Sequence, residues 1–178
     1  AQNNKLKVIN FNTNKGQSAA LSAGIERSTG DIIVTIDSDL ENDPKDILSL
    51  VDKIEQGYDV VSGLRGDRWK GSYFSRKLPS LVANKLISNI TRVRLSDYGC
   101  TLKAYSRRVI EGVQLYGEMH RFVPAIASWN GGRVTELKVS FRKRRFGKSN
   151  YGISRTFKVL LDLITIKYFM KYFNKPMH

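Results

Sequence analysis

The chain has 178 residues, of which 41% are hydrophobic, and this is enough apolar material for one domain with a buried core. Its 30 Lys and Arg against 16 Asp and Glu give a formal net charge of +14, which favours anionic partners such as nucleic acid, an anionic membrane surface or phosphorylated ligands. Cys100 is the only cysteine, which excludes an internal disulfide, and no stretch reaches the roughly 18 uncharged apolar residues of a membrane-spanning helix.

The first third of the chain alternates predicted strands and helices. Strands are predicted at 7–11, 31–37 and 58–63, and helices at 16–27 and 44–56. The β-branched run at 31–37 is typical of a parallel strand covered on both faces. Pro44 opens the second helix, with Asp43 as the expected N-cap. The alternation indicates an α/β sheet with crossover helices.

Beyond Gly63 the alternation loosens. Further helices are predicted at 76–90, 107–113, 121–129 and 154–173, further strands at 101–105 and 133–141, and a basic loop at 142–150. The chain opens at once with strand-like residues, and no strand with a nucleotide-binding turn precedes them, which is an unusual start for a doubly wound fold.

An acidic cluster follows the second predicted strand. Carboxylates at alternate positions of an extended segment project to one side, so Asp37, Asp39 and Glu41 are expected to converge beyond a strand end, where open α/β sheets bind ligands. Such hard oxygen ligands suit Mg²⁺ or Mn²⁺. The alternative is an acidic turn that caps the next helix.

Several motifs together resemble a known family. They are Asn14-Lys-Gly16-Gln17-Ser-Ala-Ala20, Ala23-Gly24, Gly30-Asp31 and Asp37-Ser-Asp39-Leu-Glu41-Asn-Asp-Pro44, followed by Gly63-Leu-Arg65, Ser75-Arg76 with Ser80 and Asn84, Asp97-Tyr-Gly99-Cys, Glu118-Met-His120-Arg121-Phe-Val-Pro124 and Arg144-x-x-Gly147-x-Ser149-x-Tyr151. This set resembles family 2 glycosyltransferases of the GT-A fold, in the subgroup of dolichyl-phosphate mannose synthases and bacterial polyprenyl-phosphate glycosyltransferases. The resemblance covers nearly the whole chain.

The resemblance implies an α/β fold, a Rossmann-like mixed sheet flanked by helices. Family members begin with a strand and turn resembling Val-Val-Ile-Pro-x-Tyr-Asn-Glu and continue to a second acidic site resembling Asp-Asp-Gly-Ser. Neither is present here, so the first strand of the sheet and its neighbour are expected to be lacking and the nucleobase pocket to be incomplete.

The resemblance also implies roles for matching residues. The nucleotide sugar is expected at Asn14, Gly16, Asp37 and Asp39, and the metal at Asp37, Asp39 and Glu41. The acceptor phosphate is expected at Arg65, Arg76, Ser80, Arg144 and Ser149. The reaction itself is expected to depend on Asp39, Arg65 and Asp97, the last of which hydrogen-bonds a sugar hydroxyl and acts as a general base only if the acceptor is an alcohol.

Two basic stretches leave alternatives open. Residues 142–148 hold five cations around Gly147, which suits diphosphate and lipid phosphate but also a solvated loop or a nucleic-acid patch. Because an acidic metal site is predicted elsewhere, we favour phosphate capture and expect no nucleic-acid partner. Residues 65–77 interleave basic and aromatic side chains, a pattern found both in single-stranded nucleic-acid grooves and at membrane interfaces.

Two units are predicted, a catalytic domain at 1–153 and an amphipathic juxtamembrane helix at 154–178. The helix carries apolar residues at helical spacing among lysines, namely Phe157, Leu160, Leu161, Ile164, Tyr168 and Phe169. It either packs on the core or lies on anionic lipid, and the pattern does not separate these two roles. His120 is interpreted as a packed or hydrogen-bonded residue.

The predicted reaction is an inverting transfer of a sugar from a nucleotide diphosphate to a polyprenyl phosphate, with Mg²⁺ or Mn²⁺ as cofactor. The enzyme is expected at a membrane, with its catalytic domain facing the cytoplasm; a homo-oligomer is left open. The rival functions are a family 2 transferase that uses a saccharide hydroxyl and a basic nucleic-acid-binding module.

Overall fold

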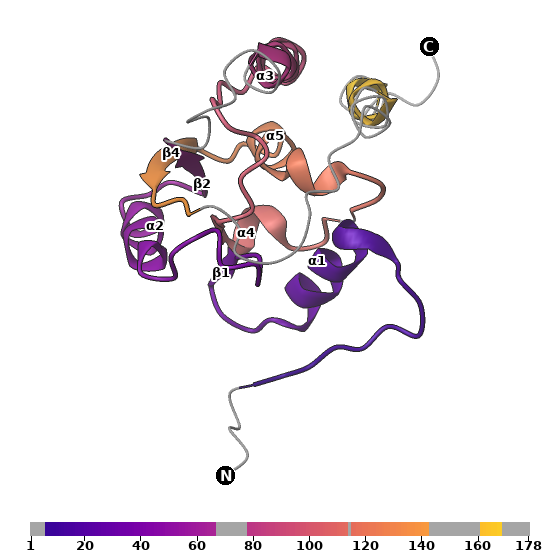
Figure 1. Cartoon of the computed structure of the whole chain (residues 1–178), viewed down its shortest axis with the longest axis vertical. Helices are drawn as coiled ribbons and strands as arrows, with labels where there is room; N and C mark the ends of the chain where they lie inside the picture. Colours follow the sequence, from indigo (N-terminus) through magenta and orange to yellow (C-terminus); the bar gives the residue numbers. More distant parts are fainter. Residues whose placement is uncertain (1–5, 67–77, 114, 143–160, 169–178) are drawn as a thin grey trace.

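A four-stranded mixed sheet organises the chain. The computed structural model describes residues 6–66, 78–113, 115–142 and 161–168. The strands are β1 (Ile32–Thr35), β2 (Val60–Arg65), β3 (Lys103–Ser106) and β4 (Val134–Val139), in the order β1-β3-β2-β4 (Figure 1). β3 is antiparallel to both of its neighbours, whereas β2 and β4 are parallel. The prediction of a mixed sheet is therefore confirmed.

The role predicted for the strand at 31–37 is wrong in one respect. β1 does occupy its centre, but its partner is the antiparallel strand β3, and within the described residues β1 is an edge strand. The parallel strand was predicted because such a β-branched run is typical of a parallel strand covered on both faces. A continuous apolar run records only that both faces of the strand are covered, and it does not record the direction of the partner.

The helices lie within a few residues of their predicted positions. They are α1 (Gly16–Arg27), α2 (Asp46–Glu55), α3 (Leu78–Thr91), α4 (Arg107–Ile110), α5 (Val123–Trp129) with a 3₁₀ turn at Met119–Arg121 before it, and a helical segment at 161–168. The predicted N-cap of the second helix is wrong. Lys45 is the N-cap, and the Asp43 carboxylate accepts from the Lys45 N–H at 3.1 Å in the turn that precedes α2.

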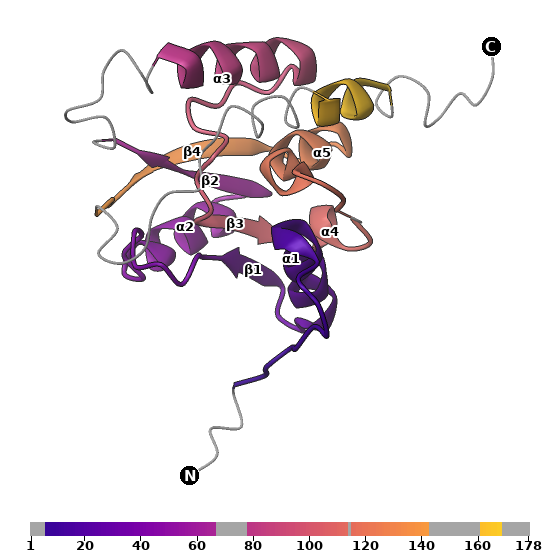
Figure 2. The same ribbon diagram turned by 45° about the vertical axis from the view of Figure 1, so that its right-hand side comes forward.

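Successive strand residues face two different layers. In β2, Val60 packs with α1, α4 and α5, while its neighbour Val61 packs with α2. In β1, Ile33 faces the first of these layers, and Ile32 and Val34 face the second. Side chains of period two therefore cover both faces of the sheet, with α2 on one side and α1, α4 and α5 on the other (Figure 2).

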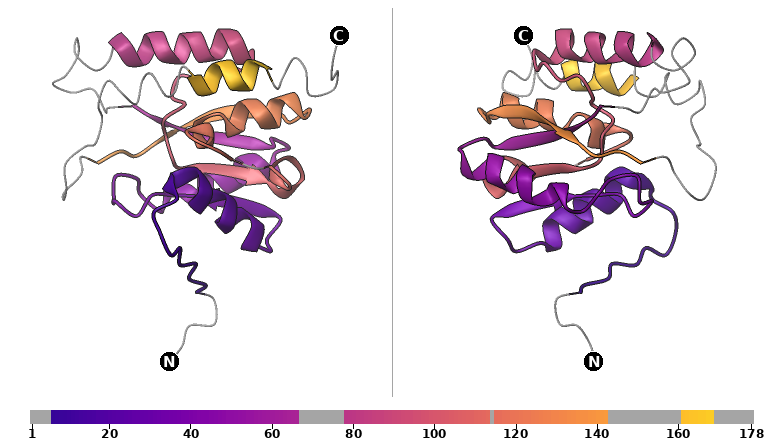
Figure 3. Two further views of the ribbon diagram at one scale, coloured as in Figure 1. Left: turned by 90° about the vertical axis from the view of Figure 1, so that its right-hand side faces the viewer. Right: turned by 60° about the vertical axis from the view of Figure 1, so that its left-hand side comes forward.

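A second helical layer lies beyond α5. Ile87 of α3 and Leu163 and Ile166 of the 161–168 segment pack around Phe122, and Leu163 and Ile166 are each only 2% exposed. Both helical elements occupy the same end of the molecule (Figure 3). The opposite face of the segment carries the exposed Leu161, Ile164 and Tyr168. No helix in the described ranges has the length and apolarity needed to cross a bilayer.

The strand predicted at 7–11 is not formed. The backbone there has no ladder partner among the described residues, and Leu6 and Val8 are each 73% exposed. The segment leads away from the sheet toward the N-terminus (Figure 1). An apolar, β-branched sequence becomes a strand only when a neighbouring strand supplies its hydrogen bonds, and none of the described strands does so here.

Candidate functional site

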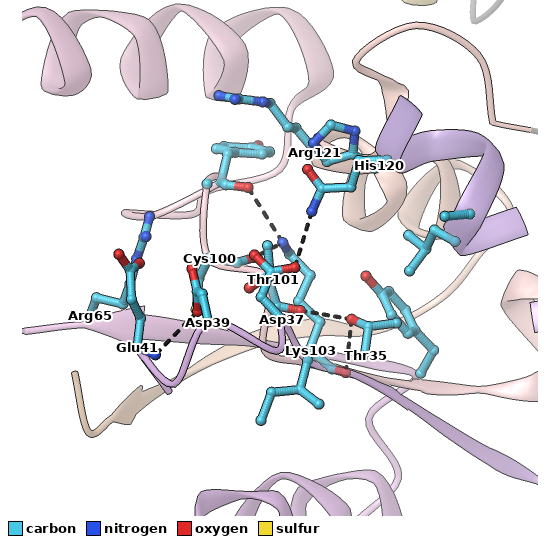
Figure 4. Close-up of a pocket in the computed structure, with 17 residues that line it drawn as sticks. Thr35, Asp37, Asp39, Glu41, Arg65, Cys100, Thr101, Lys103, His120 and Arg121 are labelled. Atoms are coloured by element: carbon cyan, nitrogen blue, oxygen red, sulfur yellow. Dashed lines mark hydrogen bonds between the residues drawn. The ribbon is translucent and has the colours of Figure 1, made fainter. Parts of the chain in front are cut away.

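A cavity of about 390 Å³ opens where β1 ends. Gln17 and Leu21 of α1 line it, together with residues that follow β1, Arg65 at the end of β2, and the turn that carries His120 and Arg121 (Figure 4). The residues at the end of β1 are Thr35, Ile36, Asp37 and Asp39. The cavity thus meets the sheet at strand ends, where polar side chains reach a ligand without disturbing the core. Acidic and basic groups share its walls.

The acidic residues lie on a turn rather than on an extended segment. Leu40 has a φ of 61°, a left-handed conformation that costs a leucine about 1–2 kcal/mol. The Glu41 N–H folds back onto Asp39 Oδ1 at 3.1 Å, and Gln17 Nε2 donates to Asp37 Oδ1 at 3.2 Å. All three carboxylates line the cavity. Within the described residues, however, no three potential metal-binding side chains approach closely enough to hold one ion together.

Arg65 and Asp97 form a buried ion pair. Arg65 Nε donates to Asp97 Oδ2 at 2.7 Å and Nη2 donates to Oδ1 at 3.0 Å, with side chains 11% and 4% exposed. The guanidinium also lies over the Phe141 ring, 5.7 Å from its centroid. Gly63 brings β2 close to the neighbouring segment, because a Cβ there would lie 2.8 Å from the Leu102 carbonyl oxygen. Arg65 lines the cavity and Asp97 does not.

Lys103 is a buried lysine in the wall of the cavity (Figure 4). It is 3% exposed, and its Nζ donates to the carbonyl oxygens of Cys100 and Tyr98. Burial disfavours the ammonium form and lowers the pKa of Lys103 from 10.5 to about 8. Sequence analysis missed this residue, because a lysine within a strand is typical of a solvent-facing position.

His120 is hydrogen-bonded, as its sequence context predicted, but it also lines the cavity. Its Nδ1 lies 3.0 Å from Ser18 Oγ, and Ser18 Oγ donates to the Gly117 carbonyl oxygen at 2.7 Å. This contact ties α1 to the turn that carries Arg121. Arg121 and Gln17 both belong to the motifs that resemble the family. Sequence analysis assigned neither of them a role, although these motifs pointed to them.

Asn14 and Gly16, the predicted nucleotide contacts, shape the start of α1. Asn14 Oδ1 accepts from the Gly16 N–H at 2.9 Å, and Gly16 has a φ of 83°, which favours glycine. Neither residue lines the cavity, whereas the next residue, Gln17, does.

The predicted acceptor-phosphate residues are only partly described. Arg65 lines the cavity, and Ser80 lies on α3. Arg76, Arg144 and Ser149 lie outside the described residues, as does the basic loop after Arg142.

Comparison with known proteins identifies the family. The glycosyl transferase family 2 profile matches residues 1–113. A dodecaprenyl-phosphate galacturonate synthase of Rhizobium johnstonii is 47% identical over 179 residues, covering 97% of this chain and 52% of that protein. An undecaprenyl-phosphate 4-deoxy-4-formamido-L-arabinose transferase of Aeromonas hydrophila subsp. hydrophila is 40% identical over 164 residues, covering 92% of this chain and 50% of that protein. The chain thus corresponds to about half of each relative.

Solved structures agree on the fold. Glucosyl-3-phosphoglycerate synthase from Mycobacterium tuberculosis, in complex with Mn²⁺, uridine diphosphate and glucosyl-3-phosphoglycerate, superposes with a TM-score of 0.63 at 19% identity, over 87% of this chain and 55% of that one. The predicted GT-A fold is confirmed by this likeness and by the family profile. The chain belongs to glycosyl transferase family 2.

Proposed function

We propose that this chain is the donor-binding part of an inverting glycosyltransferase that moves a sugar from a nucleotide diphosphate to a polyprenyl phosphate. The single observation that carries the proposal is the cavity at the end of β1, where Asp37 and Asp39 share the walls with Arg65 and Arg121. A nucleotide-diphosphate sugar and a phosphate acceptor need carboxylates for a metal ion and cations for phosphate oxygens. The names of the two curated relatives support the same acceptor class.

The carboxylates of the cavity fit a divalent metal ion. Mg²⁺ and Mn²⁺ are commonly held by one or two carboxylates together with substrate phosphates, so Asp37 and Asp39 suffice without a preformed group of three. Glu41 supplies a further oxygen donor on the same turn. When bound, the ion offsets the negative charge that develops on the departing nucleotide diphosphate. The Mn²⁺ in the mycobacterial structure supports a divalent ion in this fold.

We assign the two phosphate groups to Arg65 and Arg121. Both line the cavity, and a guanidinium binds phosphate oxygens through several N–H groups at once. In the proposed reaction an oxygen of the acceptor phosphate attacks the anomeric carbon as the bond from that carbon to the nucleotide diphosphate breaks. The two cations hold the attacking and departing phosphates together despite their mutual repulsion.

The partners and location follow from the acceptor. A polyprenyl phosphate resides in a membrane, so we place the enzyme at the membrane surface. The cytoplasmic side stays a prediction from the sequence. The basic composition and the apolar outer face of the 161–168 segment support contact with anionic lipid.

Replacing Asp39 with Asn tests the proposal. The change keeps the size of the side chain and removes the charge, so we expect sugar transfer by the intact protein in membranes or detergent to fall by at least about 100-fold. Binding of a uridine nucleotide sugar in the presence of Mn²⁺ should weaken in parallel, as measured by calorimetry.

Asp31→Asn is the matched control. Asp31 stands before β1 and outside the cavity, so this variant should transfer sugar as the unchanged protein does. If Asp39→Asn stays fully active in the presence of a chelator, the metal-dependent function is wrong.

A further inference from the structure

The Asp97 carboxylate is fully engaged by neighbouring groups. Arg65 uses two N–H groups to reach both carboxylate oxygens, and the Gly99 N–H donates to Oδ1 at 3.1 Å. Asp97 is buried and does not line the cavity. A general base must reach the proton that it removes, and this carboxylate instead faces a guanidinium.

Glu136 of β4 holds the backbone that presents Asp97. Its Oε1 accepts from the N–H groups of Ser96 at 2.6 Å and Asp97 at 3.1 Å, and its Oε2 accepts from Ser96 Oγ at 2.9 Å. β4 is paired in parallel with β2, the strand that ends in Arg65. Two hydrogen-bonded strands therefore fix both ends of one chain of contacts, from Glu136 through Asp97 to Arg65.

The bidentate contact sets the direction of the guanidinium. It uses Nε and Nη2, so the plane of the group is fixed and Nη1 is the nitrogen that faces away from Asp97. A buried ion pair of this kind adds little net stability, because desolvation offsets its attraction, but it orients a long side chain that has many rotamers. Cavity-lining groups held by such outer contacts bind their ligands in one geometry.

We propose that Asp97 and Glu136 are positioning residues which act through Arg65, and that Asp97 is not a base. This inference rests on the proposed function, in which Arg65 binds phosphate. It adds Glu136, which no sequence motif identified. It also fits an acceptor that is already an anion and needs no base.

A double-mutant cycle in the intact protein tests the coupling, with farnesyl phosphate as acceptor. Arg65→Ala and Asp97→Asn should each raise the acceptor KM by at least about 10-fold, and the double variant should resemble Arg65→Ala alone. Added guanidinium should partly restore Arg65→Ala, because the Asp97 carboxylate still binds it, and should fail to restore the double variant. Multiplicative losses, or an Asp97→Asn variant that loses kcat at unchanged KM together with the acidic limb of its pH profile, would overturn the proposal.

Glu136 supplies a conservative pair of variants. Glu136→Gln keeps an oxygen for the two N–H groups, so its acceptor KM should stay near that of the unchanged protein, while Glu136→Ala should raise it several-fold. Melting curves and the donor KM should be unaffected by Glu136→Gln. Equal effects of the two variants would contradict a role through these hydrogen bonds.

A readout without catalysis separates this inference from the proposed function. The Arg65 Nε–H proton should give a slowly exchanging NMR signal that is lost in Asp97→Asn and Glu136→Ala and kept in Glu136→Gln. If that pattern holds while no phosphate acceptor is used, the proposed function fails and the positioning role stands. A rapidly exchanging signal in the unchanged protein would overturn the positioning role.

Discussion

The buried lysine Lys103 makes the stability of the folded protein depend on pH. Its pKa is about 8 in the folded protein and 10.5 as the ordinary value. Between these values the unfolded chain holds a proton that the folded chain releases, so this group makes the free energy of unfolding rise with pH across that window. Below pH 8 both states are protonated and the cost of burying the ammonium is fully present.

We therefore expect Lys103→Met to lose this rise in stability between pH 8 and 10. The free energy of unfolding of Lys103→Met minus that of the unchanged protein should fall as pH increases, by up to about 3 kcal/mol. Denaturant titrations at several pH values measure it. Burial raises the pKa of Tyr98, which acts in the opposite direction but is present in both proteins. Burial also raises the pKa of Cys100, and the nearby Lys103 ammonium lowers it, so Lys103→Met raises the Cys100 pKa further and adds to the change in the same direction. A Lys103→Met difference that is independent of pH would contradict the expectation.

Some of the residues named from the sequence line the cavity. Asp37 and Asp39 were named because they follow a predicted strand, and Arg65 because of the family resemblance. The engagement of Asp97 by Arg65 could not be predicted, since the two residues are 32 positions apart and a carboxylate in sequence does not reveal its partner. The turn at Leu40 could not be predicted either, because leucine is not a residue that commonly adopts a positive φ.

At the scale of the element, the 161–168 segment combines two apolar faces. Leu163→Ala should lower the free energy of unfolding by about 2–5 kcal/mol, because it leaves a cavity between α3 and α5. Ile164→Ala, one residue away, removes a side chain that is 66% exposed and should cost far less. Thermal melts of the two variants measure the contrast, and equal losses would show that the segment does not pack on the core in this register.

Helices and strands were predicted well where the apolar spacing within one segment determines them. They were predicted poorly where pairing with a distant strand determines them. The helices at 16–27 and 121–129 and the strand at 133–141 depend on apolar spacing within one segment, and each is present. The antiparallel pairing of β1 with β3 joins residues more than 60 positions apart, and the 7–11 segment lacks a partner among the described residues. Neither outcome is encoded in the segment itself.

At the scale of the whole molecule, charge and apolar surface occur together. Each basic residue near an anionic surface contributes about 1 kcal/mol, so a chain of net charge +14 should co-sediment with anionic vesicles in a salt-dependent way. Leu161, Ile164 and Tyr168 should add an apolar contribution that salt does not screen.

The triple replacement of Leu161, Ile164 and Tyr168 with Ser should therefore weaken vesicle binding most at high salt and leave the melting temperature nearly unchanged. Neutral vesicles serve as the control and should bind both proteins poorly. Unfolding of the triple variant, or binding that ignores vesicle charge, would contradict a membrane-facing role for this face.

The outer edge of β1 has a consequence for ligand binding. Among the described strands nothing pairs with that edge, so its backbone N–H and C=O groups form a template on which another extended segment can assemble. Thr35 and Ile36, at the end of the same strand, line the cavity. A segment that adds to this edge would therefore lie beside the same short stretch of backbone that lines the cavity.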